Sequence, residues 1–175
     1  DSAGKLFSWG KNQWGQLGLG NTVYRSSPVQ VGLLTNWKTP TTSSNSSGCT
    51  TTDGKLFTWG QSNFGQLGLG NVTNYSSPVQ VGALTNWAIP TTSQRSVMCS
   101  KTDGTLWAWG NGSYGRLGHN NTTYYSSPKQ VGSLTNWDTP AAGNDASICS
   151  KTDGKLFSWG RNSSGPLGLG DTVYR

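Results

Sequence analysis

The sequence predicts an all-β fold, a β-propeller of stacked blades with about four antiparallel strands in each blade. Three observations support this prediction: the 175 residues repeat with a period of 50, each repeat contains a β-hairpin signal, and glycine occurs 25 times. Glycine in that number disfavours a mainly helical protein. Because one blade cannot bury both of its faces alone, the repeats must stack on one another.

The period is constant along the whole chain, without an insertion or a deletion. Its clearest mark is a tryptophan followed by a glycine, at Trp9-Gly10, Trp59-Gly60, Trp109-Gly110 and Trp159-Gly160. Ser-Ser-Pro, Thr-Asn-Trp and a cysteine recur at the same interval. Residues 1–175 therefore read as a single propeller segment of three and a half copies, with repeats 1–50, 51–100 and 101–150 and a partial repeat 151–175.

The first two strands of a repeat are joined by an Asp-Gly turn. In the third repeat, two β-like runs at 96–102 and 105–109 flank Asp103-Gly104. Asp-Gly between two such runs is a strong hairpin signal, and it favours a type I′ turn, in which both central residues have positive φ.

Side chains should alternate between the two faces of the second strand. Leu106 and Ala108 are expected on one face, and Trp107 and Trp109 on the other. We expect Trp9 and its three equivalents to lie between blades and not on the surface.

A glycine-rich corner and two further strands complete the repeat. The corner reads Gly-Gln-Leu-Gly-Leu-Gly at 15–20 and is varied at 115–120. Glycine lets the backbone turn there and pass close to its neighbours. A strand is predicted at 78–81, where the leading proline suits a strand start or a sheet edge, and another at 84–89.

Residues 54–70, followed by 76–81, resemble the repeat of the regulator of chromosome condensation family. That repeat combines a hairpin, a Trp-Gly or Phe-Gly pair, a Gly-Gln-Leu-Gly-x-Gly corner and a Pro-Val strand. The resemblance recurs four times along this chain, with the corner varied in the third and fourth copies. Family members form seven-bladed propellers, so the resemblance implies that residues 1–175 are part of a longer seven-bladed ring. One segment departs from the pattern, because serine-rich stretches such as 43–47 replace a His-containing segment before the turn.

Composition narrows the classes of protein to which the chain can belong. Lys plus Arg is 13 and Asp plus Glu is 7, which gives a net charge of +6, and only 11% of residues are charged. No apolar run is long enough to span a membrane as a helix. The chain begins at Asp1 and its only methionine is Met98, so we expect a processed chain or a fragment.

No set of residues in the sequence points to catalysis. The only histidine, His119, lies in a glycine-rich corner, and no carboxylate pair or Ser-His-Asp set stands out. Cys49, Cys99 and Cys149 share one position of successive repeats, which should place them too far apart for a disulfide. We expect three free, buried thiols, with a metal site or an intermolecular disulfide as the alternative. We also expect no enzyme activity, no cofactor and no metal.

Two groups of residues are candidates for binding. Trp14, Phe64 and Tyr114 share one position of the repeat. Exposed rings there could stack on a sugar, although packing against the neighbouring corner is the favoured interpretation. Lysines near the Asp-Gly turns could attract a polyanion, although ordinary solubilising charge is favoured. These lysines are Lys5, Lys55, Lys101, Lys151 and Lys155.

These features favour a non-enzymatic structural or adhesive module that displays loops for binding. We expect it on a phage virion, on a cell surface or in an extracellular assembly, with an intracellular location left open. Its expected partners are a protein or a glycan and other chains of an assembly. We expect no membrane span, and nucleic acid is a disfavoured partner. One alternative, which the resemblance implies, is a guanine-nucleotide exchange factor-like regulator of a small GTPase. Another is a polyanion or chromatin binder, whose affinity would fall steeply with salt.

Overall fold

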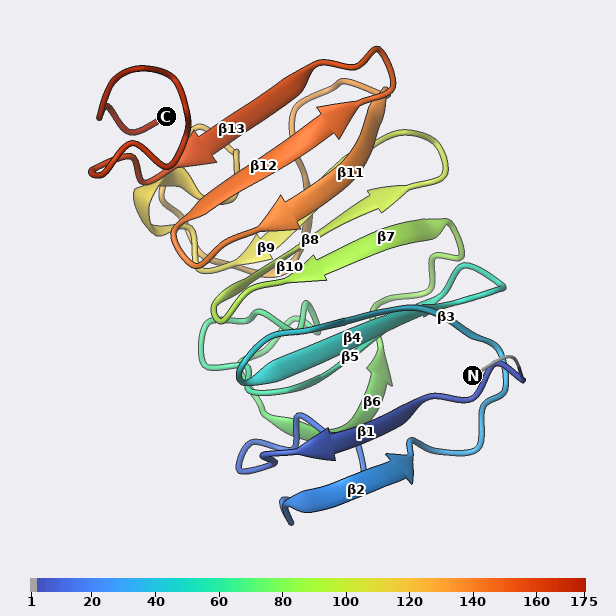
Figure 1. Ribbon diagram of the computed structural model, residues 1–175. Helices are drawn as coiled ribbons and strands as arrows, with labels where there is room; N and C mark the ends of the chain where they lie inside the picture. The colour runs from blue at the N-terminus through green and yellow to red at the C-terminus, as the bar shows by residue number, and fades with distance from the viewer. Residues whose placement is uncertain (1–2) are drawn as a thin grey trace.

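A computed structural model describes residues 3–175 and confirms the all-β fold (Figure 1). Its strands are β1 (Phe7–Gly10), β2 (Arg25–Gln30), β3 (Trp37–Thr42), β4 (Ser46–Thr51), β5 (Leu56–Gly60), β6 (Tyr75–Gln80), β7 (Trp87–Thr92), β8 (Ser96–Lys101), β9 (Leu106–Gly110), β10 (Tyr125–Gln130), β11 (Trp137–Ala142), β12 (Ala146–Lys151) and β13 (Leu156–Gly160). They form a two-stranded sheet β1-β2, four-stranded sheets β3-β4-β5-β6 and β7-β8-β9-β10, and a three-stranded sheet β11-β12-β13. All pairings are antiparallel, and each sheet is one blade.

The blades stack face to face in chain order, as Figure 1 shows. The first strands of successive blades, β3, β7 and β11, pack against one another. The main-chain N–H of Thr92 donates to Thr41 Oγ1 at 3.1 Å, and that of Ala142 donates to Thr91 Oγ1 at 3.2 Å. Sheets that meet along one edge in this way are blades around a common axis. A closed ring of seven blades stays a prediction.

The sheets begin at a different point of the repeat from the one the sequence suggested. The predicted strand at 84–89 forms at Trp87–Thr92 and opens the next blade, so a complete blade runs from β7 to β10. The predicted strand at 78–81 forms at Tyr75–Gln80. It is the last strand of its sheet, which agrees with the edge position expected from its proline.

The Asp-Gly turn is not of type I′. Gly104 N–H donates to Lys101 O at 2.9 Å, and Lys101 N–H donates to Thr105 O at 2.9 Å. Gly104 has a φ of +76°, whereas Asp103 does not take a positive φ. This is a three-residue loop in which a type I turn is followed by a left-handed glycine. The glycine is required there, because a Cβ would overlap the carbonyl of Thr135 in the adjoining loop.

The predicted alternation along the second strand of the hairpin is confirmed. Leu106 and Ala108 are buried in one cluster with Trp159 of the next blade. Trp109, on the other face of β9, is buried in a separate cluster with Leu56 of the preceding blade. The core is therefore a series of layers between blades, and each blade contributes to two of them.

Three of the four repeated tryptophans lie between blades, as predicted. Each of them donates its indole N–H to a main-chain carbonyl in the corner of the preceding repeat. The bonds are Trp59 Nε1 to Gln16 O at 2.9 Å, Trp109 Nε1 to Gln66 O at 3.0 Å, and Trp159 Nε1 to Arg116 O at 2.9 Å. The prediction is wrong for Trp9, which is 59% exposed. No described strand precedes β1, and among the described residues no second blade packs on that ring.

A glycine in each corner leaves the space that the indole ring of the next repeat occupies. A Cβ on Gly68 would lie 2.6 Å from Trp109 Nε1, and one on Gly18 would lie 2.8 Å from Trp59 Nε1. Both distances are far below van der Waals contact, so a larger residue would displace the ring. The Gly-Gln-Leu-Gly motif is thus the structural counterpart of the Trp-Gly pair in the next repeat.

The three cysteines are free and buried, as predicted. Burial raises the pKa of the Cys49 and Cys149 thiols to about 11, and it also raises the pKa of Cys99. Because the thiolate is the reactive form, all three side chains are held in their inert state near neutral pH.

Replacing Trp109 by Phe should lower the free energy of unfolding by about 1–3 kcal/mol, because the buried Gln66 carbonyl loses its side-chain donor. Trp9→Phe is the matched control, since Trp9 is exposed and donates to no carbonyl, and its effect should stay within about 0.5 kcal/mol. Urea unfolding followed by far-UV circular dichroism measures both. Equal losses in the two variants would contradict the role given to this hydrogen bond.

The thiols should react with Ellman's reagent very slowly in the folded protein at mildly alkaline pH, because burial keeps them protonated. After unfolding in urea, three thiols should titrate rapidly. Absorbance of the released thionitrobenzoate gives both rates. Rapid modification of the native protein would show that the thiols are accessible.

Candidate functional site: the corner-loop face

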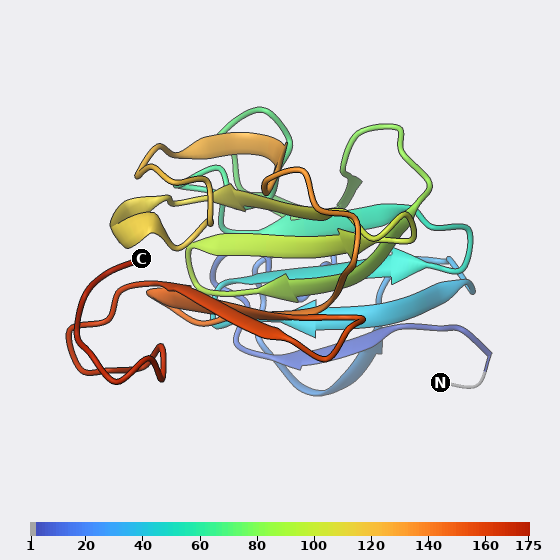
Figure 2. The same cartoon turned by 90° about the horizontal axis from the view of Figure 1, so that it is seen from above.

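The loops divide between the two ends of the strands. One end, which we call the corner face, carries the glycine-rich corners 11–24, 61–74, 111–124 and 161–174 and the short turns 43–45, 93–95 and 143–145. The other end, the hairpin face, carries the Asp-Gly turns and the loops that lead into the next blade. Figure 2 shows the C-terminal loop at one end of the strands and the N-terminus at the other.

Aromatic side chains pair across blades on the corner face. Phe64 meets Tyr124 edge to face with ring centroids 6.0 Å apart, and Tyr114 meets Tyr174 in the same way at 5.6 Å. Each pair joins one corner to the following corner, which confirms the packing that the sequence favoured for Phe64 and Tyr114. The rings still reach solvent, and Tyr114 is 40% exposed.

Trp14 occupies the same position in the first repeat but has no aromatic partner. The residue that would face it is Asn74, whose side chain accepts a hydrogen bond from the main-chain N–H of Ser62 instead. The three candidates Trp14, Phe64 and Tyr114 therefore lie on one face, but only two of them form pairs. A binding role for them stays a prediction.

Arginine is confined to the corner face. The arginines are Arg25, Arg95, Arg116, Arg161 and Arg175. Lysines, with the exception of Lys11, lie in the half of the sheets nearer to the hairpin face. Arginine guanidinium groups also stack on the aromatic rings, with Arg95 5.8 Å from the Phe64 centroid and Arg161 5.3 Å from the Tyr114 centroid.

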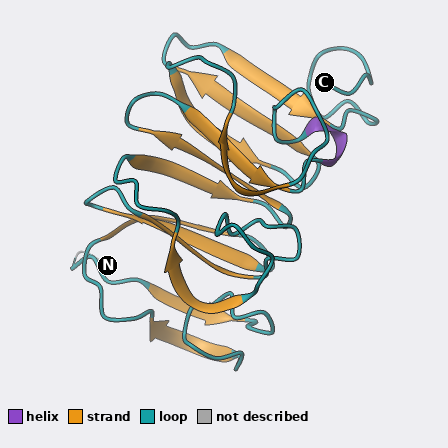
Figure 3. Cartoon of the chain, turned by 180° about the vertical axis from the view of Figure 1, so that it is seen from behind, coloured by secondary structure: helices purple, strands orange, loops and turns teal. Residues whose placement is uncertain are grey.

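The third corner differs from the first two at one buried position. In the second corner, Gln66 accepts the main-chain N–H of Phe64 through Oε1 at 2.9 Å. Arg116 takes this place in the third corner and has no acceptor to offer, so its Nε donates to Ser113 O at 2.9 Å. The corner there forms the short 3-10 helix η1 (Ser113–Gly115), in which Tyr114 has a φ of 61°. Figure 3 shows η1 as the one helical segment of the described residues.

Arg116 is buried and shares its charge partner. Its NH2 lies 2.9 Å from Asp145 Oδ1, and NH1 of Arg161 lies 3.3 Å from the other oxygen of the same carboxylate. NH1 of Arg116 also donates to Asn144 O at 2.7 Å. Burial lowers the pKa of the Arg116 guanidinium, and the charge of Asp145 opposes that shift. One carboxylate thus serves two guanidinium groups.

The lysines of the hairpin face form ion pairs or aromatic contacts within the protein. Lys55 pairs with Asp53 at 2.7 Å, and Lys155 pairs with Asp153 at 3.1 Å. Lys101 is nearly buried, and its Nζ lies 3.8 Å from the centroid of Trp107. Lys151 lies over aromatic rings in the same way. These contacts favour the interpretation of the lysines as local structural charge over a polyanion site.

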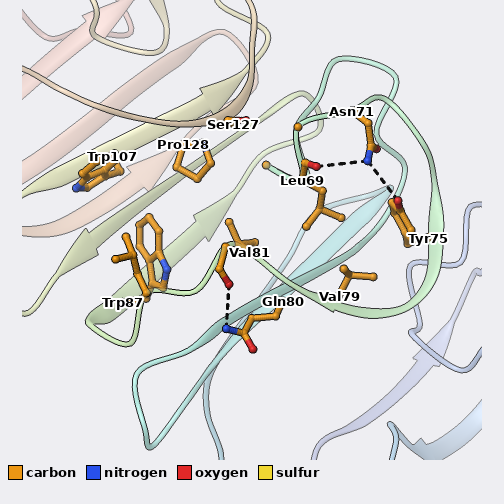
Figure 4. Close-up of a pocket in the computed structure, with 14 residues that line it drawn as sticks. Leu69, Asn71, Tyr75, Val79, Gln80, Val81, Trp87, Trp107, Ser127 and Pro128 are labelled. Carbon is orange, nitrogen blue, oxygen red and sulfur yellow. Dashed lines mark hydrogen bonds between the residues drawn. The ribbon is translucent and has the colours of Figure 1, made fainter.

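A groove of about 510 Å³ opens between the second and third blades (Figure 4). Its walls are mainly apolar and include Leu69, Val81, Trp87 and Pro128. Gln80 Nε2 at its edge donates to Gly82 O at 2.9 Å, whereas the buried indole N–H of Trp87 has no hydrogen-bond partner among the described residues. The groove is therefore mainly a shaped apolar surface with few polar groups.

His119 is half-buried, and its Nε2 lies 3.1 Å from Ala108 O while its ring packs against Tyr125. It is engaged within the fold. No helix among residues 3–175 is long and apolar enough to cross a bilayer.

Sequence reasoning missed Arg95, Arg161 and the partner tyrosines Tyr124 and Tyr174. One signal for the charged residues was available. Within the third repeat, the corner glutamine becomes Arg116 and the turn residue becomes Asp145, so that opposite charges enter two positions together. The aromatic pairs join residues 60 positions apart, and only the packing of blades reveals that offset.

Comparison with known proteins agrees with this architecture. A family model described as the regulator of chromosome condensation (RCC1) repeat matches residues 3–49, 53–93 and 103–150, and a second RCC1 repeat model matches residues 141–165. No curated protein matches the chain.

Solved propellers superpose on the chain along nearly its whole length. Human WBSCR16 does so with a TM-score of 0.87 and 24% identity, over 99% of this chain and 47% of that protein. Prp20p of Saccharomyces cerevisiae gives a TM-score of 0.83 with 23% identity, over 95% of this chain and 43% of that protein. Yeast RCC1 (Prp20) bound to Kap60 gives 0.80 with 24% identity, over 97% and 43%. The chain thus spans less than half the length of each of these proteins. At such low sequence identities, the structural similarity is evidence for a shared fold only. With the RCC1 repeat model covering most of its residues, the chain belongs to the RCC1 repeat family of β-propellers.

Proposed function

We propose that this propeller segment is a protein-binding module and that the corner face is its contact surface. The observation that carries the proposal is the gathering of the arginines and of the half-exposed aromatic pairs on one face. Arginine, tyrosine and tryptophan are the residues most enriched at binding hot spots, whereas lysine is depleted from interfaces.

The face is also preorganised for binding. Phe64 and Tyr114 are each held by a tyrosine of the following corner, and Arg95 is held over the ring of Phe64. Side chains that are already fixed lose little conformational entropy when a partner docks, so more of the contact energy appears as affinity.

Relatives support a protein partner over a virion or adhesive role. The structure of Prp20p was described together with its binding properties to Gsp1p and histones, and yeast RCC1 was solved bound to Kap60. The resemblance to this family also implies exchange activity on a small GTPase. We therefore favour the exchange factor-like alternative, with a protein as the partner, over the display module that the sequence first suggested.

A double variant Phe64→Ala and Tyr124→Ala should weaken binding of the purified chain to Gsp1p about thirtyfold, because truncating aromatic anchors that a docked partner covers costs about 2 kcal/mol or more. Biolayer interferometry measures the affinity. Leu84→Ala is the matched control, since Leu84 is also half-exposed but lies towards the hairpin face, and it should leave binding unchanged.

A second measurement separates binding from exchange. The wild-type chain should accelerate release of a fluorescent guanine nucleotide from a purified small GTPase, and the double variant should not. If the chain binds the GTPase but does not accelerate nucleotide release, the exchange-factor function is refuted and the protein-binding function stands. Equal binding by the double variant and the Leu84→Ala control would refute the corner face as the site.

A further inference from the structure

Around the third corner, the corner face carries more positively than negatively charged side chains. Around the third corner, the guanidinium groups of Arg95, Arg116 and Arg161 have one carboxylate among them, that of Asp145. Arg95 is exposed and lies over the ring of Phe64, and it takes part in none of the ion pairs found among residues 3–175. Three positive charges thus face one negative charge at this place, and Arg95 is the arginine among them that no ion pair of the described residues engages.

The charges and the rings belong to one surface. Arg116 and Arg161 lie 5.5 Å and 5.3 Å from the Tyr114 centroid, and the first side chain is buried whereas the second is exposed. Arg95 is near enough to repel the charge of Arg116. The Phe64 pair thus stands beside the unpaired guanidinium of Arg95. The Tyr114 pair stands beside Arg161, whose Nε and NH1 already donate to Ser163 Oγ and Asp145 Oδ2.

The backbone at Tyr114 is strained as well. A non-glycine residue with a φ of 61° sits in a sparsely populated region. Strain of this kind is retained where the surroundings enforce it, and it often marks a ligand contact. At this position the Tyr114 ring contacts the guanidinium groups of both Arg116 and Arg161.

We propose that the corner face recognises an acidic segment of a partner protein, with carboxylates of the partner on Arg95 and Arg161 and an apolar side chain between the aromatic pairs. This inference rests on the proposed function and specifies the chemistry of the partner. Guanidinium forks match carboxylates in a bidentate manner. A basic protein would instead be repelled at this face.

Nucleic acid fits the same charges less well. Duplex DNA binders typically neutralise about 6–10 phosphates, whereas this cluster sets three arginines against one aspartate and so carries little excess positive charge. A stripe of lysines and arginines that could follow a phosphate backbone is also missing from the described part of the face, where Lys11 is the one lysine.

The test uses fluorescence anisotropy with three probes: a labelled Glu-rich peptide that contains leucine, a Lys-rich peptide of the same length, and a short DNA duplex. The wild-type chain should bind the Glu-rich peptide and not the Lys-rich one. Arg95→Glu with Arg161→Gln should reduce that affinity by about tenfold or more. Arg95→Lys keeps the charge but loses the fork, so it should give an intermediate loss.

The matched control places a similar change of charge on the hairpin face, as Lys55→Glu with Lys155→Gln, and it should leave binding unchanged. Arg95 is exposed, so the single variant Arg95→Glu should fold normally, which far-UV circular dichroism checks. If the control and the arginine variants lose the same affinity for the Glu-rich peptide, the binding depends only on the net charge of the protein, and the proposal is overturned.

Two further outcomes decide between explanations. Tighter binding of the DNA duplex, lost in the same arginine variants, would overturn the proposal in favour of nucleic acid. If the Glu-rich peptide does not bind while Gsp1p binding still depends on Phe64 and Tyr124, the inference about acidic partners is wrong and the protein-binding function stands.

Discussion

The hydrogen bond from a tryptophan indole to the corner carbonyl of the preceding repeat determines how the blades stack. It forms at 2.9–3.0 Å between each pair of successive repeats, and donor and acceptor are always 43 residues apart. Both groups are polar and buried, so each is costly to leave unpaired. The indole N–H finds its acceptor in the preceding repeat, so each repeat gains stability from its neighbour.

The acceptor of this bond is a main-chain atom, which frees the side chain at the same position to vary. Gln16 and Gln66 donate to a main-chain carbonyl in the next blade, and Arg116 makes the equivalent bond although its chemistry differs. The indole bond of Trp159 is unchanged by that substitution. The fold is therefore specified by the backbone of the corner, and a local charge can be introduced without altering the stacking of the blades.

Much of the fold could be predicted from the sequence because its period is constant. The hairpins, the burial of Trp59 and the alternation of Leu106 and Trp109 follow from repeat spacing and strand geometry alone. The turn at Asp103 was harder, because Asp-Gly suits two loop types and only the hydrogen bonds distinguish them. The pairing of Phe64 with Tyr124 could not be predicted, since it depends on how far one blade is rotated against the next.

The two faces of the stack use charge in opposite ways, and this difference bears on recognition. On the hairpin face, each of these lysines contacts an aspartate close in sequence or an aromatic ring. Their ammonium groups are therefore already engaged and are less available to another molecule. On the corner face, one aspartate is shared by two arginines, and Arg95 has only a ring beneath it. A surface recruits a partner through groups that the fold leaves incompletely satisfied. In this propeller such groups are concentrated at the third corner, where the sequence of the repeat departs furthest from its neighbours.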